Sequence, residues 1–293
     1  MHTATNAPVS PGSSASALYQ RQSVGVWHGA VDSLAPVETH LAAQLQRLSE
    51  PCFLTLRDGV PMVSAQGSAT LGTLPGHDEG FPLHAWLNPV ALEDLGDKQF
   101  CRDLGIRFPV VGGSMAHGIS SPEIAEALGR QGMISFIGTA GQSPASVEQL
   151  ILRMKHLNPA VPFGFNLIHS PNETGLEETL VELYIRHDLH LIEASAFLTV
   201  TLPLVRYRLH GIHRAPDGRI VVPNRIMAKV SRIEVAAKFF APPPEKMVQE
   251  LVQRGVLTSE QAQLAAQIPL AQDITAEADS GGHTDNRPAV TLL

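Results

Sequence analysis

Cysteine and positive charge are both scarce in this 293-residue chain. Cys52 and Cys101 stand alone, without a CxxC or metal-ligand spacing, so a disulfide framework is not expected and a reducing cytoplasm fits best. The 28 acidic residues outnumber the 21 Lys and Arg, which gives a formal net charge of −7. General nucleic-acid binding, which needs a basic surface, is therefore not expected.

Long apolar runs and the commonest catalytic signatures are also missing. No stretch approaches about 20 uninterrupted apolar residues, so we expect no membrane span. Residues 1–22 lack the basic and apolar regions of a signal peptide and predict a disordered tail. GxSxG, Walker and HExxH motifs do not occur. The spaced pairs His187/His190 and His210/His213 have no accompanying carboxylate or cysteine set, so no metal site is expected.

Residues 23–104 predict a small N-terminal cap domain. Apolar runs at 52–56 and 60–63 flank Asp58-Gly59, which indicates two short strands around a tight turn. Gly and Pro recur over residues 67–89, as is typical of a β-rich or irregular fold. No catalytic pattern is visible in this region.

Residues 105–293 predict an α/β fold with a parallel sheet. Apolar strands alternate with polar or glycine-rich loops and helices, and the expected strands are 108–113, 134–138, 163–168, 190–194, 225–230 and 273–278. The spacing, and the polar residues that follow the strands, favour a TIM (β/α)8-type barrel. A doubly wound sheet is less favoured because no GxGxxG follows the first strand.

Two insertions interrupt this barrel pattern. Residues 206–222 predict a β-hairpin around Asp217-Gly218. Residues 242–268 predict a helical hairpin, whose second helix is opened by a capping box at residues 258–261.

Two glycine pairs follow predicted strands and could approach a flat ligand, because glycine has no Cβ. The first is Gly112-Gly113, followed by Ser114 and by Met115, which could pack on an aromatic ring. The second, Gly281-Gly282, precedes His283, whose imidazole can exchange a proton near neutral pH. The alternatives are a tight βα turn and a polar turn with a solvated histidine.

Two polar residues stand inside otherwise apolar predicted strands. Asn166 needs a hydrogen-bond partner if it is buried, from either the backbone or a ligand. Lys229 is a candidate ligand-binding cation, and the alternative is a snorkelling or salt-bridged lysine.

Taken together, residues 109–118, 164–168, 224–232 and 278–288 resemble the PfaD-type enoyl reductases of polyunsaturated fatty acid and polyketide synthases. That family belongs to an FMN-dependent group that includes the nitronate monooxygenases (2-nitropropane dioxygenases). The insertion that begins at Phe239 is similar to the PfaD branch.

The resemblance implies FMN at the carboxyl end of the barrel, reduced by NADPH or NADH. It implies that His283 is catalytic, as the proton donor to the α-carbon of an enoyl thioester. The residues that it implies bind the cofactor are Gly112, Gly113, Ser114, Met115, Asn166, Lys229, Asp279, Gly281 and Gly282.

The resemblance also implies an acyl carrier protein as partner. Residues 206–232 hold seven Lys or Arg against one acid, Asp217, which could dock an acidic carrier, although a solvated hairpin is equally compatible. Six predicted strands are fewer than eight, so we expect an incomplete barrel. Nitronate oxidation, and a non-catalytic fragment or subunit that needs a partner to complete the barrel, remain the alternative functions.

Overall fold

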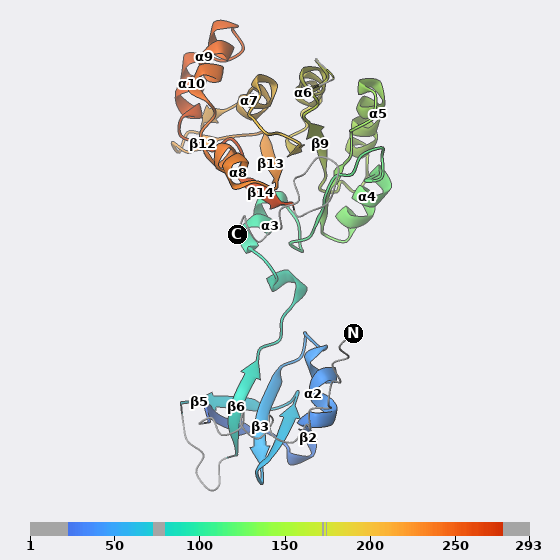
Figure 1. The fold of residues 1–293 in the computed structure, drawn as a ribbon, viewed down its shortest axis with the longest axis vertical. Helices are drawn as coiled ribbons and strands as arrows, with labels where there is room; N and C mark the ends of the chain where they lie inside the picture. Colours follow the sequence, from blue (N-terminus) through green and yellow to red (C-terminus); the bar gives the residue numbers. More distant parts are fainter. Residues whose placement is uncertain (1–22, 73–79, 172, 174, 278–293) are drawn as a thin grey trace, which may run out of the picture. The chain divides into compact units, whose positions relative to one another are not determined.

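The protein was analysed as a computed structural model that describes residues 23–72, 80–171, 173 and 175–277. The predicted tail, residues 1–22, lies outside the described residues. The chain divides into two compact units, Met1–Gly96 and Asp97–Leu293 (Figure 1).

The first unit is an antiparallel sheet of six strands in the order β2-β4-β3-β6-β1-β5. Asp58 and Gly59 both have positive φ and form the predicted two-residue turn between β3 and β4. Trp27, Phe53 and Leu83 form its apolar core. The elements are β1 (Gly25–His28), a 3-10 helix (Val31–Ser33), β2 (Ala35–Pro36), α2 (Val37–Leu45), β3 (Cys52–Arg57), β4 (Val60–Ser64), β5 (Ser68–Leu71), β6 (Phe81–Leu87) and a second 3-10 helix (Leu92–Asp94).

The second unit is built on six parallel strands in the order β14-β13-β10-β9-β8-β7. The strands are β7 (Val111–Gly112), β8 (Ile134–Ile137), β9 (Gly164–Ile168), β10 (Leu191–Ser195), β13 (Arg225–Val230) and β14 (Asp273–Ala276). Each strand of this sheet lies beside the one that precedes it in the chain, without the reversal of a doubly wound fold. The sheet curls, with helices on its outside, as in part of a (β/α)8 barrel (Figure 1). The predicted fold class, an incomplete TIM-type barrel with an N-terminal β-rich region, is confirmed.

Helices join the parallel strands and follow the local sequence signals. Ser121 and Ser143 cap α4 and α5 with their side chains, and a proline occupies the first turn of each helix. The helices of this unit are α3 (Lys98–Leu104), α4 (Pro122–Arg130), α5 (Pro144–Lys155), α6 (Leu176–Arg186), α7 (Leu202–Leu209), α8 (Ile233–Phe240), α9 (Glu245–Gln253) and α10 (Ser259–Ala265). Within the described ranges, no helix is both long and apolar enough to cross a membrane.

The two faces of the parallel sheet differ in chemistry, which decides where a site can form. Side chains such as Phe165, Leu167 and Ile192 belong to the large apolar core that includes residues of the surrounding helices. Because strand side chains alternate between faces, Asn166 and Glu193 point to the opposite, inner face. The fold therefore places polar groups inside the curled sheet.

The predicted hairpin insertion at residues 206–222 starts too early. Arg206 lies inside α7, and the hairpin strands are only β11 (His213–Arg214) and β12 (Ile220–Val221). Pro203 sits in the first turn of α7, and Gly211, with φ of 76°, follows its end. Arg206 and Arg208 interrupt the apolar pattern of α7, so the sequence indicated a hairpin where the helix continues.

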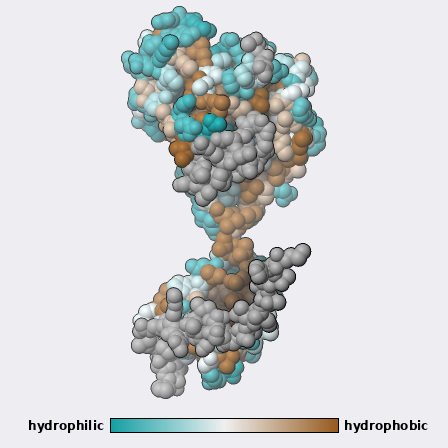
Figure 2. Space-filling view, viewed as in Figure 1, coloured by the Kyte–Doolittle hydropathy of each residue, from teal (hydrophilic) through white to brown (hydrophobic). Residues whose placement is uncertain are grey.

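The second insertion contains α9 and α10. Thr258 and Gln261 form the predicted capping box at the start of α10, with both reciprocal hydrogen bonds present. The surface over these two helices is mostly hydrophilic (Figure 2).

Candidate functional site

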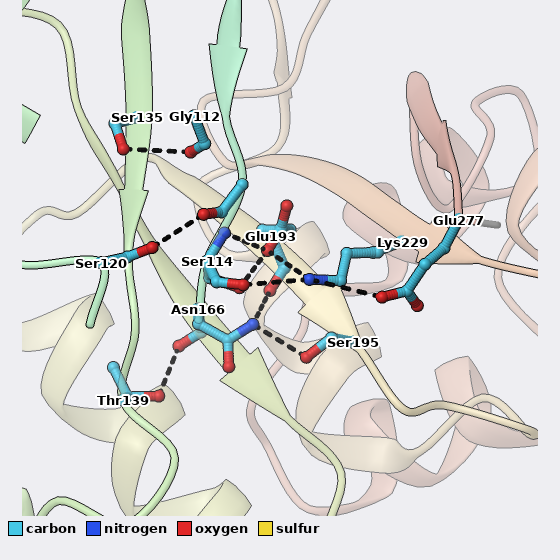
Figure 3. A network of polar contacts seen from close by, with 11 residues as sticks. Gly112, Ser114, Ser120, Ser135, Thr139, Asn166, Glu193, Ser195, Lys229 and Glu277 are labelled. Carbon is cyan, nitrogen blue, oxygen red and sulfur yellow. Dashed lines mark hydrogen bonds and ion pairs between the residues drawn. The ribbon is translucent and has the colours of Figure 1, made fainter. Parts of the chain in front are cut away.

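Polar side chains from three strands, and from residues that follow two others, meet on the inner face of the parallel sheet (Figure 3). Glu193 of β10 is in register with Asn166 of β9 and with Met227 of β13. Lys229 lies two residues beyond Met227 and therefore shares its face. Ser114, two residues after β7, and Glu277, directly after β14, complete the group that we call the Glu193 cluster: Ser114, Asn166, Glu193, Lys229 and Glu277.

Glu193 is the centre of the cluster and is completely buried. Its Oε2 accepts hydrogen bonds from the backbone N–H of Ser114, at 3.0 Å, and from the Ser114 hydroxyl. Its Oε1 has no hydrogen-bond partner in the part of the chain that the structure describes. Burial raises the pKa of Glu193 above its ordinary value, and Lys229 and the Ser114 hydrogen bonds oppose that rise.

Lys229 lies between two carboxylates. Its Nζ is 3.7 Å from Glu193 Oε2 and 3.8 Å from Glu277 Oε1, and it donates a hydrogen bond of 3.1 Å to the Ser114 carbonyl oxygen. The Lys229 side chain is only 12% exposed, so these ion pairs are weakly screened by solvent. Lys229 is therefore salt-bridged within the sheet, and it also lines a cavity of about 20 Å³ at the strand ends.

Asn166 finds its partners in the protein, as a buried amide must. Its Nδ2 donates to the Glu193 carbonyl oxygen at 3.1 Å and to the Ser195 hydroxyl at 2.8 Å. Its backbone carbonyl oxygen accepts hydrogen bonds from the Thr139 hydroxyl at 3.0 Å and from the Tyr184 hydroxyl at 2.6 Å. Asn166 thereby ties β9 to β10 within the Glu193 cluster.

The two glycines at the carboxyl end of β7 have different surroundings. A Cβ on Gly112 would lie 2.7 Å from both Leu128 Cδ1 and Ser135 Oγ, so that glycine is required by packing within the fold. A Cβ on Gly113 would meet only Glu193 Oε1, at an ordinary 3.5 Å. Of the two positions, only residue 113 has no steric need for glycine in the described structure.

The loop that follows β7 is held close to β8. A Cβ on Gly138 would lie 1.7 Å from the Met115 carbonyl oxygen, so the loop can approach only because residue 138 is glycine. The Ser120 hydroxyl donates to the Gly113 carbonyl oxygen at 2.8 Å, and the backbone N–H of His117 donates to the carbonyl oxygen of residue 140 at 2.9 Å. The Met115 side chain on this loop is 47% exposed.

Curated relatives and a solved structure are similar to about two thirds or more of this chain. A polyunsaturated fatty acid synthase subunit of Thraustochytrium sp. is 40% identical over 225 residues, which are 76% of this chain and 15% of that protein. The polyketide biosynthesis protein PksE of Bacillus subtilis is 41% identical over 205 residues, 70% of this chain and 27% of that protein. No protein-family model matches the chain.

The solved structure is the enoyl reductase domain of MlnA, from the macrolactin biosynthesis cluster of Bacillus amyloliquefaciens. It is 41% identical, with a TM-score of 0.63, over 67% of this chain and 45% of that one. The chain is a homologue of the PfaD-type enoyl reductases. It spans about a quarter or less of the two curated relatives and under half of the solved domain.

This PfaD-type homologue brings together four of the residues expected to bind a cofactor: Gly113, Ser114, Asn166 and Lys229. Gly112, the last residue of β7, and Met115, in the loop that follows, adjoin them in the chain. The remaining candidates lie outside the described residues: Asp279, Gly281, Gly282 and His283.

Sequence reasoning missed Glu193, Glu277 and Gly138. Glu193 carried a usable signal, because an acid within Leu191-Ile192-Glu193-Ala194 is as unusual in a buried strand as Lys229 is. Gly138 carried none, since its role depends on a loop from a distant part of the chain. Among the residues that are described, no three His, Cys, Asp or Glu side chains are placed to hold a metal ion.

Proposed function

We propose that this chain contributes the FMN-binding barrel of an enoyl reductase that acts on enoyl thioesters bound to a carrier protein. The observation that carries the proposal is the Glu193 cluster, which extends from the middle of β9 and β10 to the carboxyl ends of β7, β13 and β14, in a chain homologous to an enoyl reductase domain. Barrel enzymes place their active sites at this end.

The residues present fit a flavin. The polar edge of a flavin ring system carries hydrogen-bond acceptors and gains negative charge on reduction, and Lys229 supplies a nearly buried cation. Gly113 leaves the β7 loop without a side chain at the strand end, where a flat ring could come close. Bound FMN would supply hydride transfer, from NADPH or NADH to the β-carbon of the enoyl thioester.

The protein residues then have separate tasks. Lys229 offsets negative charge in a site of low exposure, where such an interaction is strong. Asn166 holds β9 against β10 through the two hydrogen bonds that its side-chain amide donates to β10. His283 remains our candidate for the group that protonates the α-carbon, directly or through water.

The role of His283 is tested by replacing it. His283→Ala should retain FMN through a desalting column but lose about 100-fold or more in turnover, the usual contribution of a positioned proton donor. Flavin absorbance and stopped-flow oxidation of the nicotinamide measure the two properties. Unchanged turnover would remove His283 from the mechanism.

The substrate class is tested by comparing two oxidants of the reduced flavin. We expect NADPH or NADH oxidation to depend on a crotonyl thioester, with butyryl thioester as product, and not on propionate 3-nitronate. Oxygen-dependent turnover of the nitronate without thioester reduction would instead support the nitronate monooxygenase alternative.

The carrier protein would dock on the hairpin β11–β12 in this proposal. Several of the basic residues in 206–232 are not available for docking. Arg208 is buried, Arg225 pairs with Asp103, and Lys229 belongs to the Glu193 cluster. Arg214 and Arg219 are exposed on the hairpin, where Arg219 also pairs with Asp217 at 2.7 Å.

Reversing the charge of Arg214 and Arg219 together should therefore raise KM for a carrier-bound thioester and leave a free thioester unaffected. Equal effects on both substrates would argue against docking at this hairpin.

A further inference from the structure

We propose that Glu193 is a positioning residue, which presets both the β7 loop and the Lys229 ammonium for a bound flavin. The inference rests on the proposed function, because the flavin is the group for which they would be preset. Its basis is the convergence of Ser114 and Lys229 on one carboxylate oxygen.

The first step concerns the β7 loop. Glu193 Oε2 accepts from both the backbone N–H and the hydroxyl of Ser114, across 79 residues of sequence. The Ser114 carbonyl oxygen is in turn bonded to Lys229. Three groups of one loop residue are thus held by two side chains of the sheet, which fixes the backbone immediately after Gly113.

The second step concerns charge. Lys229 lies within 4 Å of two carboxylates, Glu193 and Glu277, and both are shielded from solvent. The three side chains together carry one net negative charge when all are ionised. A ligand that gains negative charge beside Lys229 is therefore disfavoured by Glu193, and neutralising Glu193 would make such a state easier to form.

Glu193 Oε1 has no hydrogen-bond partner among the described residues, and a buried carboxylate oxygen without a partner costs free energy. Holding the Ser114 loop requires only the acceptor that Oε2 provides. A glutamine at this position could still accept from Ser114 through its amide oxygen, but it could not form the ion pair with Lys229. Glu193→Gln therefore separates the two tasks of the residue.

The experiment measures FMN affinity and the midpoint potential of bound FMN. It is run at about pH 8 because burial raises the pKa of Glu193, and an alkaline pH favours the ionised carboxyl. The variants are Glu193→Gln and Glu193→Ala. The matched control is Glu182→Gln, which removes a carboxylate paired with Arg206 on the helical layer. Thermal unfolding of each FMN-free chain reports whether the variant is folded.

Glu193→Gln should shift the potential in the positive direction and change the FMN Kd by less than about threefold, whereas Glu193→Ala should weaken FMN binding by about tenfold or more because the loop anchor is lost. Glu182→Gln should change neither quantity. A role in folding alone would lower the unfolding temperature without moving the potential.

An unchanged potential in Glu193→Gln, with FMN bound as in the parent chain, overturns the inference and leaves the proposed function standing. Failure of the parent chain itself to bind FMN overturns both. If Glu193→Gln does not fold, Lys229→Gln provides the same contrast, since losing the cation should shift the potential in the negative direction; no shift there also overturns the inference.

Discussion

Gly112 and Gly113 are adjacent and chemically identical, yet the structure predicts opposite outcomes for their replacement by alanine. A Cβ on Gly112 would press on Leu128 Cδ1 and on Ser135 Oγ, both at 2.7 Å. The Leu128 side chain can turn aside, but Ser135 is held by its hydrogen bond of 3.0 Å to the Gly112 carbonyl oxygen. Overpacking of this kind costs about 1–3 kcal/mol.

Gly112→Ala should therefore lower the free energy of unfolding by about 1–3 kcal/mol, or several degrees in Tm for a unit of this size. Gly113→Ala meets only an ordinary contact of 3.5 Å and has no positive φ. Its stability should stay the same or rise by up to about 1 kcal/mol, because alanine reduces the entropy of the unfolded chain. Its FMN affinity should fall, since the methyl group occupies the strand end.

The assay is chemical unfolding of the FMN-free chain followed by circular dichroism, because helices α3 to α10 all belong to the second unit. Tryptophan fluorescence would report on the wrong unit, since Trp27 and Trp86 both lie in the first. FMN titration completes the comparison. The reasoning is refuted if Gly113→Ala is the less stable variant, or if Gly112→Ala is as stable as the parent.

Three further outcomes follow from the cluster and from the helical insertion. Lys229→Met should destabilise the fold by about 3 kcal/mol, because it leaves the buried Glu193 carboxylate without its cation; urea unfolding at neutral pH tests this, and a loss below about 0.5 kcal/mol would contradict it. Burial raises the pKa of Glu193, so the Glu193 carboxyl group binds its proton more tightly in the folded chain than in the unfolded chain. The contribution of Glu193 should therefore favour folding at low pH and be lost as the pH rises through the folded-state pKa; a pH series should show this dependence in the parent chain and not in Glu193→Gln, and parallel curves would count against it. Thr258→Ala removes one half of the capping box and should cost about 1 kcal/mol without changing FMN affinity, as thermal unfolding and flavin titration can verify.

Much of the parallel sheet could be predicted because its strands are buried and carry strong local signals. Residues 134–137 and 164–168 are apolar runs that end at glycine or polar residues, and serine caps with a following proline mark α4 and α5. Helix α7 was missed because its basic residues concealed the apolar face formed by Leu204, Val205 and Tyr207.

The site was predictable only in part, for a physical reason. A lysine or an asparagine in an apolar strand is visible in the sequence, and Lys229 and Asn166 were found in this way. Pairing across the sheet is not visible, so neither the contact between Ser114 and Glu193 nor the need for glycine at residue 138 could be derived. The difference in steric surroundings between Gly112 and Gly113 likewise depends on long-range packing.

The activity proposed for this chain is the passage of hydride through FMN to an enoyl thioester. The most direct measurement loads the chain with FMN, removes excess flavin, reduces it with one equivalent of NADPH or NADH without oxygen, and then adds crotonyl carrier protein. We expect the nicotinamide to bleach the flavin band, the thioester to restore it, and one equivalent of butyryl product to form. Flavin that is lost on desalting, or that stays reduced until oxygen is admitted, would contradict this proposal.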